Sequence, residues 1–96
     1  MFNSSNYIKN AQKLNTDELI IEAKKEIKRL KLDFNDSDII ILGADLKSWV
    51  IHQACKPTKE QSEKASSIAK KIGYEMDWNE EDDRESIEWF LSKNKE

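Results

Sequence analysis

Apolar residues recur at helical spacing most regularly between residues 16 and 31. The stripe that they form lies on one face of a helix with 3.6 residues per turn, and its members are Leu19, Ile20, Ala23, Ile27 and Leu30. Asn15 precedes this stripe as an N-cap residue, and Glu18 stands three residues later, where its side chain can return the hydrogen bond. Acidic residues come early in the segment and basic residues late, as the helix dipole favours. The pattern predicts a helix over residues 16–31.

Four other segments are expected to be helical, at about 5–13, 38–56, 59–72 and 80–93. Thr58 and Gln61 have the spacing of a second capping box, and Gly73 stands where a left-handed residue commonly ends a helix. Residues 1–14 are mostly polar, so this segment either forms the short first helix or frays. Helices therefore account for most of the predicted structure.

The start of the segment at 38–56 fits two structures. The β-branched residues 39–41, with Gly43 behind them, are typical of a short buried strand at 38–42. The same segment also forms one helical face, made of Ile39, Leu42, Leu46, Trp49, Val50 and Gln53. We favour a helix that is broken near Gly43, because a strand needs a partner and no other segment resembles one. Asp36 or Ser37 is expected to cap it.

The length and the helix pattern together predict the fold class. A chain of 96 residues is expected to form a single domain over residues 1–96, with one core and little room for a large ligand cavity. The prediction is a compact all-α domain of four to five short helices. The alternative is an α+β domain with the short strand at 38–42.

Charge is divided unevenly along the chain. Residues 1–74 carry thirteen basic and ten acidic residues, whereas residues 75–96 carry three basic and nine acidic ones. Such a division suggests an acidic end that meets a basic partner. The same division also fits internal pairing with the basic helix at 16–31, or head-to-tail association with a second copy of the chain.

The acidic end contains the candidate binding residues. In a helix over 80–93, the side chains of Ile87, Phe90 and Leu91 face the core, while four carboxylates and Trp89 face away from it. Tryptophan is enriched at binding hot spots, so this face is a candidate contact surface. The predicted partner-binding residues are Glu81, Asp82, Glu85, Glu88 and Trp89, extended by Glu75, Asp77 and Trp78.

A simpler explanation applies to part of this acidic surface. The helix dipole stabilises acidic residues in the first turn by roughly 0.3–1 kcal/mol each, which accounts for residues 80–83 if the first turn is 79–83. It does not account for Glu85 and Glu88, which repel each other. A solvated helix face explains these two residues without any partner, so the exposure of Trp89 distinguishes the two interpretations.

Several classes of function are disfavoured. Cys55 is the single cysteine, which excludes an intramolecular disulfide and a thiolate-rich zinc site and fits a reducing compartment. His52 lies three residues before Cys55, but the negative end of a helix dipole disfavours the thiolate that catalysis needs. With two glycines, the chain cannot build a glycine-rich phosphate loop. We therefore expect no enzymatic activity, no metal and no cofactor.

Residues 42–45, LGAD, resemble the LGADS stretch that precedes the phosphopantetheine serine of acyl carrier proteins. Leu46 stands at the position of that serine, and the residues that follow lack an acidic recognition face. The chain is therefore not expected to carry this prosthetic group.

The location is expected to be cytoplasmic. The N-terminal residues lack the apolar core of a signal peptide. The apolar run at 39–44 is too short to cross a bilayer, so no membrane partner is expected.

These observations predict a small non-enzymatic binding or inhibitor protein that docks its acidic C-terminal helix on a basic macromolecule, for example a nucleic-acid-binding enzyme. In size and charge the chain is similar to small acidic phage inhibitors, including some anti-CRISPR proteins that mimic nucleic acid. One alternative is an immunity or antitoxin-like neutraliser that uses Trp49 or Trp89 as an apolar anchor. Another is a nucleic-acid-binding regulator that uses helices 16–31 and 59–72, although a pI of about 5.3 and two arginines disfavour it.

Overall fold

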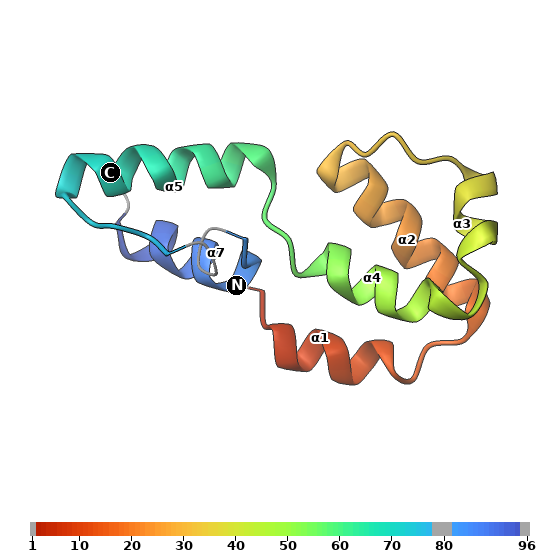
Figure 1. Cartoon of the computed structure of the whole chain (residues 1–96). Helices are drawn as coiled ribbons and strands as arrows, with labels where there is room; N and C mark the ends of the chain where they lie inside the picture. The colour runs from red at the N-terminus through yellow and green to blue at the C-terminus, as the bar shows by residue number, and fades with distance from the viewer. Residues whose placement is uncertain (1, 78–81, 95–96) are drawn as a thin grey trace. The chain divides into compact units, whose positions relative to one another are not determined.

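The computed structural model of the chain describes residues 2–77 and 82–94, and all regular structure within these ranges is helical (Figure 1). The elements in chain order are α1 (Ser4–Ala11), α2 (Thr16–Leu30), α3 (Asp36–Leu42), the 3₁₀ turn η1 (Gly43–Asp45), α4 (Leu46–Ala54), α5 (Lys59–Ile72) and α7 (Arg84–Lys93). The all-α fold class predicted from the sequence is confirmed. None of the described helices is long and apolar enough to cross a membrane.

Three helix ends lie where the capping residues predict them. The Asn15 side chain accepts a hydrogen bond from the Glu18 N–H at 2.9 Å, and the Glu18 carboxylate accepts one from the Asn15 N–H at 3.1 Å. Thr58 and Gln61 form the same reciprocal pair at the start of α5, at 3.1 and 3.0 Å. Gly73 ends α5 with a φ of 72°, a conformation that a side chain would strain. Local chemistry therefore sets these ends.

The segment at 38–56, predicted as a helix broken near Gly43, forms two helices, α3 and α4, with η1 between them. The break falls at Gly43, whose φ of 50° and ψ of −119° are unfavourable for any residue with a Cβ atom. The alternative of a strand at 38–42 is wrong, because the apolar residues 39–41 lie inside α3. A strand also needs a partner strand, and the described part of the chain contains none.

The cap of α3 is Asn35, which corrects the prediction that Asp36 or Ser37 caps this helix. The Asn35 side chain accepts a hydrogen bond from the Asp38 N–H, and the Asp38 carboxylate accepts one from the Asn35 N–H, both at 3.0 Å. Neighbouring Asn, Asp and Ser residues are all good caps. Asn35 is the cap because an acidic residue stands three positions after it and can complete the reciprocal pair.

The chain divides into two compact units, each with its own apolar cluster. We call Ser4–Ala54 the N-terminal unit, and Met1–Asn3 together with Cys55–Glu96 the C-terminal unit. Each unit is described separately below. The expectation that residues 1–96 form a single domain stays a prediction.

Helix α4 is the centre of the N-terminal unit, since α1, α2 and α3 all pack against it. The buried cluster consists of Leu19, Ala23, Ile39, Leu46 and Val50. Trp49 stacks on Phe34 beside this cluster, with ring centroids 4.8 Å apart. Tyr7 of α1 packs against the same cluster, so the N-terminal segment forms a docked helix.

Arg29 joins α2 to the end of α4. Its Nε donates a hydrogen bond to Oε2 of Glu26 at 2.7 Å, and its Nη2 donates one to the carbonyl oxygen of Gln53 at 3.0 Å. Carbonyl groups in the last turn of a helix lack intrahelical partners, so a cation at this place satisfies one of them. Arg29 therefore contributes to the fold of the N-terminal unit.

In the C-terminal unit, α5 and α7 pack against each other (Figure 1). Their buried cluster consists of Ala65, Ile68, Ala69, Ile87 and Phe90. Leu91 is partly buried against this cluster, so the predicted core face of the last helix is confirmed. Three of the candidate binding residues, Glu85, Glu88 and Trp89, also lie on α7.

We expect Ile87→Ala to lower the free energy of unfolding by about 2–5 kcal/mol, because it leaves a cavity between α5 and α7. The Ile87 side chain is 1% exposed, whereas Ile72 on α5 is 56% exposed. Ile72→Ala is the matched control, with an expected change within about 0.5 kcal/mol. Urea denaturation followed by circular dichroism measures both values. Equal effects of the two replacements would contradict the packing described for Ile87.

Candidate partner-binding site on the C-terminal helix

Helix α7 begins at Arg84, later than the predicted start near residue 80. Asp83 is the N-cap, and its carboxylate accepts hydrogen bonds from the Ser86 N–H at 3.3 Å and from the Ser86 hydroxyl at 2.8 Å. The backbone of Asp83 is extended, so α7 begins only after this residue. Of the predicted first turn at 79–83, Asp82 and Asp83 are therefore not helical, and residues 79–81 lie outside the described residues.

The later start changes the explanation of the acidic residues. Asp82 lies in a turn before the helix and is exposed, while Glu85 lies in the first turn of α7. The helix dipole therefore stabilises Glu85, one of the two acidic residues for which the predicted first turn did not account. Glu81 and Trp78 lie outside the described residues.

Glu88, the second of these acidic residues, is engaged within the chain. Its Oε2 accepts a hydrogen bond from Nε of Arg84 at 2.7 Å, and its Oε1 accepts one from the Phe2 backbone N–H at 3.0 Å. The Glu88 side chain is 18% exposed. This carboxylate therefore does not belong to an open acidic face.

Arg84 completes the same cluster. Its guanidinium carbon lies 4.2 Å from the centroid of the Phe2 ring, a cation–π contact, and its backbone N–H donates to the carbonyl oxygen of Cys55 at 2.8 Å. We call Phe2, Arg84 and Glu88 the clasp. The clasp was not predicted from the sequence, although a spacing of four residues between Arg84 and Glu88 is a signal for an ion pair on one helix face.

The clasp keeps the pKa of Glu88 low. Burial is the largest single cause and raises the pKa, because a buried carboxylate loses hydration. Four interactions lower the pKa. They are hydrogen bonds from the Arg84 side chain and the Phe2 N–H, the positive charge of Arg84, and a hydrogen bond with the Gln61 side chain. Together they hold the pKa of Glu88 below its ordinary value of 4.5.

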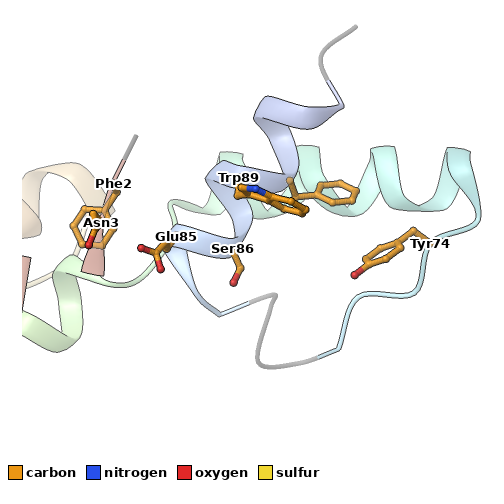
Figure 2. A pocket seen from close by; sticks show the side chains of 7 residues that line it. Phe2, Asn3, Tyr74, Glu85, Ser86 and Trp89 are labelled. Atoms are coloured by element: carbon orange, nitrogen blue, oxygen red, sulfur yellow. The ribbon is translucent and has the colours of Figure 1, made fainter. Parts of the chain in front are cut away.

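Trp89 remains largely exposed, at 53% of its surface, beside an open groove of about 550 Å³. The groove is lined by Phe2, Asn3, Tyr74, Glu85, Ser86, Trp89 and Phe90. Figure 2 shows the Trp89 ring over α7, with Glu85 and Phe2 toward one end of the groove and Tyr74 toward the other. Nζ of Lys93 lies 4.7 Å from the Trp89 ring centroid. The groove is therefore aromatic and has one carboxylate in its wall.

The structure brings together only some of the predicted partner-binding residues. Glu85 and Trp89 line the same groove, one turn apart on α7. Glu75 and Asp77 are exposed in the segment between α5 and α7 and do not line the groove. Phe2 was not predicted, because nothing within its neighbourhood in the sequence indicates a contact with α7.

Within residues 2–77 and 82–94, no three His, Cys, Asp or Glu side chains form a group that could hold a metal ion. No protein-family model matches the chain, and no curated protein or solved structure is significantly similar to it. Functional inference therefore depends on the chemistry of the groove and of the clasp.

We expect Glu88→Gln to lower the free energy of unfolding at neutral pH, since Arg84 would lose its charged partner. The folded-state pKa lies below the unfolded one, so the contribution of Glu88 is fully present well above pH 4.5 and is lost as the pH falls through the folded-state pKa. The difference in stability between wild type and variant should shrink over this range. Urea denaturation between pH 3 and pH 7 measures it.

The matched control is Glu63→Gln on the exposed side of α5. It should show no comparable pH-dependent difference from wild type. A constant difference between Glu88→Gln and wild type over the whole pH range would contradict the role assigned to the clasp.

Proposed function

We propose that the chain is a non-enzymatic binding protein that docks on a basic surface of another macromolecule and blocks or modulates it. The contact would be the Trp89 face, which we define as Asp82, Glu85 and Trp89, extended by Glu75 and Asp77. The observation that carries this proposal is the exposed tryptophan beside an aromatic groove with a carboxylate in its wall.

An exposed tryptophan contributes a large binding free energy when a partner covers it. Tryptophan side chains bury about 150–250 Å² in interfaces, and about 25 cal/mol is gained for each Å² of apolar surface removed from water. Trp89 has about half of its surface still to bury, so covering it is worth roughly 2–3 kcal/mol. This gain is large enough to make Trp89 the anchor of an interface.

The acidic surroundings favour a partner of opposite charge. Residues 75–96 carry nine acidic and three basic residues, so the region around the anchor is strongly negative. Charge complementarity accelerates association and excludes partners of the same charge. A basic groove that normally holds nucleic acid is a surface of the required kind, and an inhibitor that fills it would act as a nucleic-acid mimic.

Glu88 is omitted from the Trp89 face, although it was among the predicted partner-binding residues. Its two carboxylate oxygens already accept hydrogen bonds from Arg84 and Phe2. Its contribution to binding would be indirect, through the position of Phe2 in the groove.

The two alternative functions have less support. An apolar-anchor neutraliser would have to use Trp89, because Trp49 stacks on Phe34 in the N-terminal unit. A nucleic-acid-binding regulator would lack arginines to read bases, because Arg29 and Arg84 are both engaged within the chain. We propose the cytoplasm as the location, since the single cysteine, Cys55, forms no disulfide within the chain.

We expect Trp89→Ala and Glu85→Lys each to abolish capture of the partner by the immobilised full-length chain in a lysate of the source organism. Wild type should retain the partner at low salt and release it at high salt, because charge contributes to the contact. Mass spectrometry identifies the captured protein, whose surface should be basic.

Two control variants are matched to these replacements. Ile72→Ala truncates another exposed apolar residue, and Glu63→Lys reverses another exposed acid on α5. Both should capture the partner as wild type does. The proposal is refuted if all four variants retain the partner equally.

A further inference from the structure

The clasp shows how this unit holds a cation. The guanidinium group of Arg84 lies over the Phe2 ring at 4.2 Å and donates to the Glu88 carboxylate at 2.7 Å. An aromatic face provides the cation–π contact, and a carboxylate provides the charged hydrogen bond. One guanidinium group is therefore bound by an aromatic ring and an acid together.

The lining of the groove contains the same two components, an aromatic ring and a carboxylate. Trp89 and Glu85 are spaced four residues apart on α7, which places them next to each other on one helix face. Both line the groove, and the Trp89 ring is the larger and more exposed aromatic surface. The arrangement repeats the acid and the aromatic ring of the clasp on the open side of the helix.

We propose that this groove binds an arginine side chain from a basic segment of the partner protein. The guanidinium group would stack on Trp89 and donate to the carboxylate of Glu85. Arginine fits this site better than lysine, because its planar group stacks on a ring and donates to a carboxylate through two N–H groups. This inference rests on the proposed function and names the chemistry of the partner.

The size and the charge of the groove agree with such an occupant. A volume of about 550 Å³ lies within the range of roughly 300–1,000 Å³ that is typical of sites for small ligands, so a side chain with part of its backbone can enter. Nζ of Lys93 already lies 4.7 Å from the Trp89 ring, so this indole accepts a cation in the free chain. A partner arginine would stack on the indole where it borders the groove, or would displace Lys93.

The test is a titration of the full-length, ¹⁵N-labelled chain with the peptide acetyl-Gly-Arg-Gly-amide, followed by amide and indole chemical shifts. The comparison peptide carries citrulline, which has the shape of arginine and no charge. We expect saturable shifts centred on Glu85 and Trp89. Citrulline should bind roughly 3- to 30-fold more weakly, as expected for the loss of a cation–π contact.

Variants then test each component of the site. Trp89→Leu removes the π-face and keeps an apolar side chain, and Glu85→Gln removes the charge and keeps the shape. Each should weaken arginine binding by roughly 3- to 30-fold. Glu63→Gln, which removes an exposed acid that does not line the groove, should bind arginine as wild type does.

Three results would overturn the inference. The first is equal affinity for the arginine and citrulline peptides. The second is a set of chemical-shift changes spread over the acidic surface away from Trp89. The third is a chemical-shift change at Trp89 that depends on protein concentration alone, which would mean that a second copy fills the groove. If the peptide fails to bind while Trp89→Ala still abolishes partner capture, the inference fails and the proposed function stands. If the peptide binds while capture is unchanged in the variants, the proposed function fails and the arginine site stands.

Discussion

The carboxylate of Glu88 connects segments of the C-terminal unit that are far apart in the sequence. It accepts hydrogen bonds from the Phe2 N–H and from the Arg84 side chain, and it also interacts with Gln61 at the start of α5. The backbone of Arg84 is bonded in turn to Cys55. The N-terminal residues, the start of α5 and the start of α7 therefore depend on one ionised group. Because that group is mostly shielded from water, removing it would leave the guanidinium charge of Arg84 poorly compensated.

The contacts made within the chain give different roles to acidic residues that look equivalent in the sequence. Asp83 is committed to the cap of α7, and Glu88 is committed to the clasp. Asp82 is exposed, and Glu85 combines a stabilised position in the first turn with a place in the groove wall. The net charge of the region determines how strongly it attracts a basic partner. It does not show which carboxylates can contact one, because that depends on where each carboxylate lies in the fold.

The sequence predicted the features that depend on neighbouring residues. The caps at Asn15 and Thr58 and the left-handed end at Gly73 each involve residues at most four positions apart, so the pattern contains the information. The start of α7 was missed because several consecutive acidic residues compete as caps, and Asp83 prevails through its bonds to Ser86. The bond between Phe2 and Glu88 joins residues 86 positions apart, and no local pattern indicates it. Of the residues that line the groove, the sequence therefore named Glu85 and Trp89. It missed Ser86 and the walls contributed by Phe2, Asn3 and Tyr74.

The clasp and the groove share Phe2, and this sharing has a consequence for how binding data are interpreted. Phe2 lies under the guanidinium group of Arg84 and also lines the groove beside Trp89, while its backbone is held by Glu88. A replacement at Glu88 would therefore move a wall of the groove without removing any group that contacts an occupant. Glu85 and Glu88 are three residues apart and carry the same charge, yet a loss of binding would mean a lost contact at Glu85 and a displaced wall at Glu88. A charge reversal at Glu88 cannot by itself assign that residue to an interface, whereas a replacement of the exposed Trp89 removes a side chain that lines the groove and is not part of the clasp.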